Sequence, residues 1–157
     1  MDLGSIVLWI IVGGIAGLLA DLHLTLASVE LGTGGLISGR LAGAHNPSFR
    51  GGLVLSDFDA MHRSLSNAQS DELHQAAVIE AARGIRNVHH SDLALAALLR
   101  DRTDGPGLQL FAALVSEDEV ESLQRGFGGH SGLAAQWASN AALGLVWKVL
   151  KKKDTVD

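Results

Sequence analysis

Apolar runs alternate with short polar or glycine-rich turns along the whole chain, and their spacing switches repeatedly between helical and strand-like. Apolar residues three and four positions apart predict helices, whereas short β-capable runs bounded by turn residues predict strands. The pattern predicts helices over residues 3–20, 36–42, 71–86 and 131–152 and strands over residues 24–29, 51–55, 92–98, 108–115 and 119–127. This alternation is typical of an α/β domain, and the last two strands read as a hairpin that adds an antiparallel edge to the sheet.

The first predicted helix, residues 3–20, contains no charged residue and is therefore apolar on every face. About 18 apolar residues is the lower limit for spanning a bilayer, and Gly13 and Gly17 have the spacing that lets membrane helices approach closely. Asp2 and Asp21 stand where a signal peptide or an anchor carries basic residues. Such a helix needs a second apolar surface, and we favour burial or an interface with another subunit over lipid, which remains the alternative.

Composition narrows the function classes. The chain has 157 residues, of which 47% are hydrophobic and 18% charged, which fits one globular domain and excludes a disordered chain. The net charge of −5 leaves no basic field for a nucleic acid backbone. Cysteine and tyrosine are absent, so thiolate chemistry and a tyrosine proton donor are excluded. We expect a cytoplasmic protein, associated with a membrane through residues 3–20 if lipid covers that helix.

The stretch 24–41 passes from a strand through a glycine-rich turn into a helix. At such a junction the backbone N–H groups of Gly32, Thr33, Gly34 and Gly35 can hold an anion such as a phosphate without any lysine. The alternative is a tight connection that simply needs small residues, and the motif alone favours that reading.

The same stretch resembles a known family. Val-Glu-Leu-Gly-Thr-Gly-Gly-Leu at residues 29–36 is similar to the Ala-Glu-Ser-Cys-Thr-Gly-Gly-Leu motif of the CinA C-terminal domain, the nicotinamide-nucleotide amidohydrolases. A second family motif, Gly-Gly-Val-Val-Ala-Tyr-Ser-Asn-Glu-Ala-Lys, lies over residues 51–61, and the likeness covers roughly residues 16–150. The resemblance implies a single three-layer α/β/α domain with a mixed, mainly parallel sheet. It also implies a pyridine-nucleotide or other phosphate-containing small molecule as ligand, no cofactor, and a homo-oligomer or a subunit of a complex.

The domain boundaries follow from the apolar first helix and from the extent of the family resemblance. We expect an apolar first helix at residues 1–20, a CinA C-terminal-like domain at residues 21–153, and a short tail at residues 154–157.

The departures from the family pattern concern the chemistry. The nucleophilic serine of the family falls on Leu31, its neighbouring cysteine on Gly32, its tyrosine on Ser56 and its activating lysine on Met61. Leucine cannot attack an amide carbon and methionine cannot take a proton, so the catalytic residues are unknown. The family's later loop is also shortened and charged here, at residues 99–107.

The remaining candidates for ligand binding are Glu30, Ser56 and the four residues of the glycine-rich turn. Ser56 follows the second strand, at what would be the carboxyl end of a parallel strand, where open α/β sheets place ligands. For Glu30 and Thr33, a role in shaping the turn by hydrogen bonds is an equal alternative. The seven histidines show no metal-ligand spacing, so no metal site is expected, and a triad of Ser56, His62 and Asp59 rests on spacing alone.

The sequence therefore supports three hypotheses about the function of the protein. The first is a catalytically degenerate relative of nicotinamide mononucleotide deamidase that acts in assembly or in binding a nucleotide-like ligand. The second is an active amidohydrolase with substituted residues, with Ser56 attacking and His62 or Glu30 as base. The third is an accessory subunit anchored in a membrane by residues 3–20.

Overall fold

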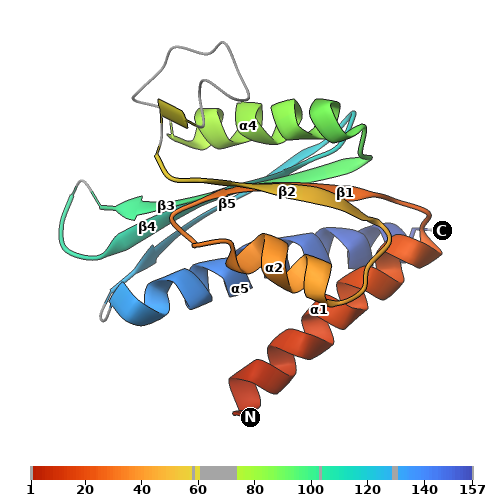
Figure 1. Ribbon diagram of the computed structural model, residues 1–157, viewed down its shortest axis with the longest axis horizontal. Helices are drawn as coiled ribbons and strands as arrows, with labels where there is room; N and C mark the ends of the chain where they lie inside the picture. The colour runs from red at the N-terminus through yellow and green to blue at the C-terminus, as the bar shows by residue number, and fades with distance from the viewer. Residues whose placement is uncertain (1, 58, 61–73, 103, 129–130, 157) are drawn as a thin grey trace.

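The computed structural model describes residues 2–57, 59–60, 74–102, 104–128 and 131–156. Its strands form one sheet, and its helices pack on that sheet (Figure 1). The elements are α1 (Leu3–Asp21), β1 (Leu26–Leu31), α2 (Leu36–Gly43), β2 (Phe49–Leu55), α4 (His74–His89), β3 (Leu93–Asp101), β4 (Leu108–Val115), β5 (Val120–Phe127) and α5 (Ser131–Asp154).

The five strands form one mixed sheet in the order β2-β1-β3-β4-β5. β1 pairs in parallel with β2 on one side and with β3 on the other. β4 and β5 continue the sheet as an antiparallel hairpin. The α/β fold with an antiparallel hairpin edge, predicted from the sequence, is confirmed.

Helices cover both faces of the sheet, which gives three layers (Figure 1). α4 lies on one face, and α1, α2 and α5 lie on the other. Because successive strand residues point to opposite faces, β1 sends Leu26 toward α5 and Ala27 toward α4. Both faces of the central strands are covered, and this explains the continuous apolar run of β3.

Some predicted boundaries are wrong. β3 does not end at residue 98 but continues to Asp101, because Arg100 and Asp101 pair with Gln109 and Leu108 across the hairpin strand. α4 runs to His89 through residues that the sequence assigned to a turn. Its predicted start at residues 71–73 lies outside the described residues.

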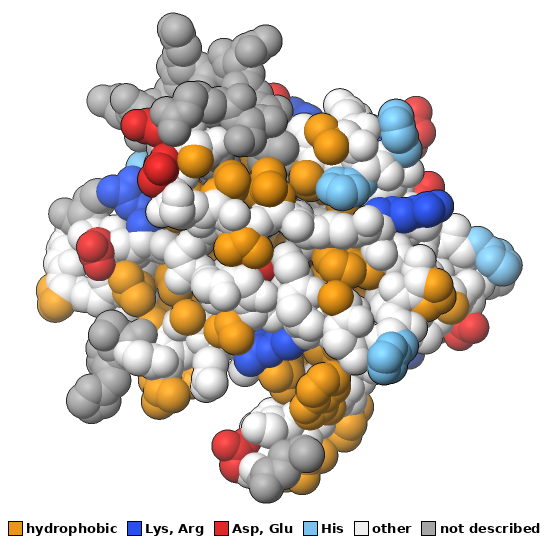
Figure 2. Space-filling view, in the orientation of Figure 1, with side chains coloured by type: hydrophobic (Ala, Val, Ile, Leu, Met, Phe, Trp, Pro, Cys, Tyr) orange, Lys and Arg blue, Asp and Glu red, His pale blue; other side chains and the backbone are white. Residues whose placement is uncertain are grey.

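α1 is packed on the body over only part of its length. Its buried residues, Val12, Ile15 and Leu19, all lie in its second half. Gly14 lets this half approach α5, since a Cβ there would come within 2.1 Å of the Trp147 ring. The first half projects beyond the body, and hydrophobic side chains gather on it (Figures 1 and 2).

Candidate functional site

The glycine-rich turn lies at the carboxyl edge of the parallel strands. Leu31 at the end of β1 pairs with Leu55 of β2 and with Leu98 of β3, so the segments that follow these strands begin at the same edge. Gly32, Gly34 and Gly35 all adopt positive φ angles, of 85°, 66° and 83°. The turn therefore occupies the edge at which open α/β sheets place ligands.

Glu30 is buried beside this turn, and its carboxylate accepts four hydrogen bonds from the protein itself. Oε1 accepts from the Thr33 hydroxyl at 2.6 Å and from the Ile37 amide at 3.2 Å. Oε2 accepts from the amide and from the hydroxyl of Ser38, both at 2.7 Å. Ile37 and Ser38 are the second and third residues of α2, so Glu30 satisfies amides that a helix N-terminus leaves open and places negative charge at its positive end.

This hydrogen-bond network extends from Glu30 to Ser28, and Arg40 is influenced by Glu30 only through its charge. The Ser28 hydroxyl lies 3.0 Å from that of Ser38, and Gly52 on β2 leaves room for both, since a Cβ there would come within 2.2 Å of Ser38 Oγ. Arg40 Nη1 donates to Asn140 Oδ1 of α5 at 2.8 Å. Burial lowers the pKa of the Arg40 guanidinium, and the charge of Glu30 opposes that shift.

Leu31, on which the resemblance places the family's serine, points to the opposite face of the sheet from Glu30. It is 9% exposed and belongs to the apolar layer under α4, together with Val29 and Leu98. Its neighbour Gly32 is confined by the backbone of β3, since a Cβ there would lie 2.1 Å from the Leu99 carbonyl oxygen. Met61, at the position of the family's lysine, lies outside the described residues.

Ser56 is exposed in the turn after β2, and Asp59 is exposed shortly after it. Asp57 Oδ1 accepts from the Ala60 amide at 2.5 Å, which shapes that turn. His62 lies outside the described residues, so the predicted triad stays a prediction. The four donors to Glu30 come from the turn and from α2, and Ser56 is not among them.

The charged segment at residues 99–107 contains an ion pair. Arg102 Nε lies 3.0 Å from Asp104 Oδ1, and Arg102 Nη2 lies 3.0 Å from Asp104 Oδ2. This two-pronged contact lowers the pKa of the Asp104 carboxyl and raises that of Arg102. No group of three histidine, cysteine, aspartate or glutamate residues in the described ranges is placed to hold a metal ion.

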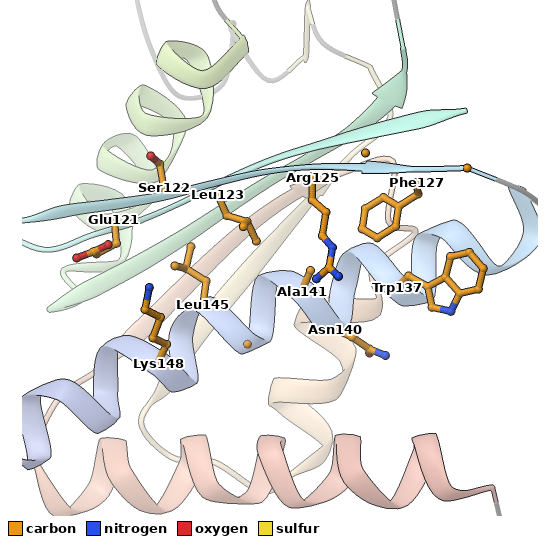
Figure 3. Close-up of a pocket in the computed structure, with 13 residues that line it drawn as sticks. Glu121, Ser122, Leu123, Arg125, Phe127, Trp137, Asn140, Ala141, Leu145 and Lys148 are labelled. Carbon is orange, nitrogen blue, oxygen red and sulfur yellow. The ribbon is translucent and has the colours of Figure 1, made fainter. Parts of the chain in front are cut away.

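A groove of about 740 Å³ separates β5 from α5 (Figure 3). β5 turns Glu121, Leu123, Arg125 and Phe127 toward it, and Gly144 helps to keep its α5 wall open. The Phe127 ring lies 6.5 Å from the Trp137 ring, and the Arg125 guanidinium lies 6.0 Å from the Phe127 centroid.

Two cations that have no ionic partner among the described residues enter this groove. Arg125 reaches from β5 toward α5, and Lys148 reaches from α5 toward β5 (Figure 3). Neither forms a salt bridge within the described residues, although Glu121 also lines the groove. In a chain with a net charge of −5, this groove is therefore locally suited to an anion.

Sequence reasoning missed Arg125 and Ser38. The signal for Arg125 was its place in the alternation of β5, where it shares a face with Leu123 and Phe127, which pack on the core. The signal for Ser38 was its position in the first turn of α2, directly after the glycine-rich turn.

The fold defines an α/β domain of the kind found in the CinA, or competence-damage, superfamily. A competence or damage-inducible protein from Enterobacter asburiae superposes with a TM-score of 0.81 at 24% identity, over 91% of this chain and 98% of that one. A CinA superfamily protein from Klebsiella pneumoniae gives 0.80 at 20% identity, over 92% and 98%. A competence/damage inducible protein from Agrobacterium tumefaciens gives 0.80 at 19% identity, over 92% and 95%. No protein-family model matches the sequence, and no curated protein matches it significantly.

Proposed function

We propose that the protein is a CinA-like domain that lacks the serine–lysine amidohydrolase reaction and acts as a subunit of an assembly. Two features at the carboxyl edge support the loss of that reaction. The serine position holds the buried Leu31, and the Glu30 carboxylate is engaged by four donors from the protein. Neither group is arranged to attack an amide or to accept a proton from a nucleophile.

The observation that carries the assembly role is the uncovered first half of α1. Five large apolar residues in this half, Leu3, Ile6, Val7, Trp9 and Ile10, are 43–77% exposed, whereas Leu8 packs partly against the core. Ile15 and Leu19, in the second half, are fully buried. A contiguous apolar surface of this size is costly to leave in water and marks an interaction site.

A protein partner fits this helix better than a membrane span. Among the described residues α1 is the helix long and apolar enough to cross a bilayer, with a mean hydropathy of 2.3. The part before Val12, its first buried residue, is only about 14 Å long at 1.5 Å per residue, whereas the hydrocarbon core is about 30 Å thick. A span would therefore have to pull Val12, Ile15 and Leu19 out of the core.

Ile10→Asp and Val88→Asp form a matched pair that tests the assembly role. Ile10 is 65% exposed on α1 and Val88 is 64% exposed on α4. We expect the native protein to run as a defined oligomer without detergent, and Ile10→Asp to weaken association on the order of 100-fold by placing a charge in an apolar contact. Val88→Asp should leave the mass unchanged in analytical ultracentrifugation.

The same preparations test the chemistry. Ammonia release from nicotinamide mononucleotide should stay at the buffer background. A monomeric native protein, or one that needs detergent to stay in solution, contradicts the assembly role. Sustained ammonia release contradicts the loss of activity and revives the amidohydrolase hypothesis.

A second candidate function, the binding of a small anionic ligand, is favoured by the two cations in the groove between β5 and α5, which form no salt bridge within the described residues. Arg125 and Lys148 would hold a phosphate or carboxylate, and Phe127 and Trp137 would contact a flat ring. A nucleotide-like ligand combines these two features. The glycine-rich turn is the competing location, but two amides of α2 there already bind Glu30.

Titration calorimetry with nicotinamide mononucleotide separates the two locations. We expect Arg125→Ala to weaken binding roughly 10-fold, because one charge-assisted contact is lost. Arg83→Ala is the control, since Arg83 is paired with Glu80 on the outer surface of α4. Binding that survives Arg125→Ala but is lost on Gly34→Val would move the ligand to the glycine-rich turn, and a flat trace with the native protein would remove this candidate.

A further inference from the structure

α1 carries a second apolar stripe, on the side that faces away from its own body. The residues of this stripe, here called the α1 seam, are Leu3, Ile6, Ile10, Gly13, Gly17 and Ala20, and all six are exposed. They are spaced alternately three and four positions apart, which is the heptad spacing of helices that pack side by side. The helix thus has one stripe for its own core and a full-length stripe for a partner.

The size of the side chains changes along the seam. Large residues, Leu3, Ile6 and Ile10, occupy its first half, and small ones, Gly13, Gly17 and Ala20, its second. A Cβ added at Gly13 or Gly17 would meet nothing within 4 Å, so these positions are open on the outer side of the helix. Gly14, by contrast, faces Trp147. The glycines of the seam are therefore not required by the packing of this chain on itself.

We infer that the partner of the α1 seam is the same helix of a second copy, packed antiparallel across a two-fold axis. This inference rests on the proposed assembly role and specifies its partner. In this register Leu3 of one copy lies opposite Ala20 of the other, Ile6 opposite Gly17, and Ile10 opposite Gly13. Every layer then joins one large and one small residue. The side chains therefore fill the contact along its whole length while the distance between the two helix axes stays constant.

A parallel pair would not fit the same residues as well. It would place three layers of large residues against each other at one end and three layers of small residues at the other, so the two axes could not stay equidistant. The antiparallel pair also covers the projecting half of each α1, because that half lies on the supported half of its partner. Such a contact is self-complementary and closes after two copies. The same register places Asp2 of one copy opposite Asp21 of the other at each end of the contact, where water and salt screen the repulsion between the two carboxylates.

The chain contains no cysteine, so engineered cysteines report the register without background. Positions 3 and 20 of one helix are about 25 Å apart, which is too far for a disulfide within a chain. We expect the double variant Leu3→Cys/Ala20→Cys to form a disulfide-linked dimer on oxidation. The single variants Leu3→Cys and Ala20→Cys should not cross-link, because equivalent residues lie at opposite ends of the pair.

Gly17→Leu supplies an independent measurement. The added side chain enters open space in the free chain, so the variant should fold, but it fills the space that Ile6 of the second copy needs. The dissociation constant of the dimer should rise on the order of 100-fold. Gly39→Leu is the matched control, since Gly39 is an exposed helical glycine with open space on α2.

The outcomes separate this inference from the assembly role. Efficient cross-linking of Leu3→Cys alone would indicate a parallel pair and overturn the register. A stable oligomer that neither cross-links through positions 3 and 20 nor responds to Gly17→Leu would overturn the seam and leave the assembly role standing. A monomer at all concentrations would overturn both.

Discussion

Replacing Glu30 by alanine is expected to lower the free energy of unfolding by about 3 kcal/mol or more. The substitution removes the acceptor of four hydrogen bonds and leaves two hydroxyls and two amides at the start of α2 without it. For a chain of this size, that corresponds to a fall of roughly 6–12 °C in the melting temperature. Thermal unfolding followed by circular dichroism measures it.

Two further variants sharpen this expectation. Glu30→Gln keeps the shape of the side chain but turns one oxygen into a donor that faces other donors. The free energy of unfolding of this variant should therefore lie between that of the native protein and that of Glu30→Ala. Glu80→Ala is the control, since that carboxylate is partly exposed and forms only a surface pair with Arg83, and its effect should stay within about 0.5 kcal/mol. A melting temperature of Glu30→Ala equal to that of the control would mean that the network does not hold the turn.

Gly32→Ala is expected to destabilise the fold by about 3 kcal/mol, and Gly34→Ala by only about 1 kcal/mol. Both glycines adopt positive φ angles, so both substitutions strain the backbone. Only at Gly32 does the added Cβ also meet a backbone atom, the Leu99 carbonyl oxygen at 2.1 Å, whereas at Gly34 it meets nothing within 4 Å. Denaturant unfolding of the two variants separates strain from steric conflict, and equal losses would contradict the packing of the turn against β3.

This pair of variants bears on the chemistry as well. The resemblance places the family's cysteine on Gly32, and any side chain there would collide with the backbone of β3. Introducing the family's serine and cysteine at Leu31 and Gly32 should therefore cost stability before it restores a reaction. We expect the turn to serve the structure first, with Glu30 and Thr33 holding its shape.

Ligand binding at the turn would have to compete with an internal anion. The sequence offered the amides of residues 32–35 to a phosphate, and directly after them the amides of Ile37 and Ser38 in the first turn of α2 are bonded to Glu30. The groove lined by Arg125 and Lys148 also contains Glu121, but that carboxylate forms no salt bridge with either cation within the described residues. This difference is the physical reason for proposing that groove, rather than the turn, as the location of a small anionic ligand.

The sequence by itself determined the order of the elements, the apolar character of α1 and the glycine-rich turn after β1. These features are local, because the period of apolar residues and the backbone freedom of glycine act within a few positions along the chain. The expectation that the serine and lysine of the CinA motifs fall on Leu31 and Met61 likewise comes from the sequence alone.

The tertiary structure decided which groups meet. It directed Glu30 to the amides of α2, joined Arg40 to Asn140 one hundred positions away, and brought Arg125 to Lys148 across a groove. It also divided α1 into a packed half and a projecting half, which a helix that is apolar all round does not reveal. The period of apolar and polar residues predicts which face of a helix or strand is buried. The neighbour that packs against a side chain, or forms its hydrogen bond, is fixed only when distant segments pack together.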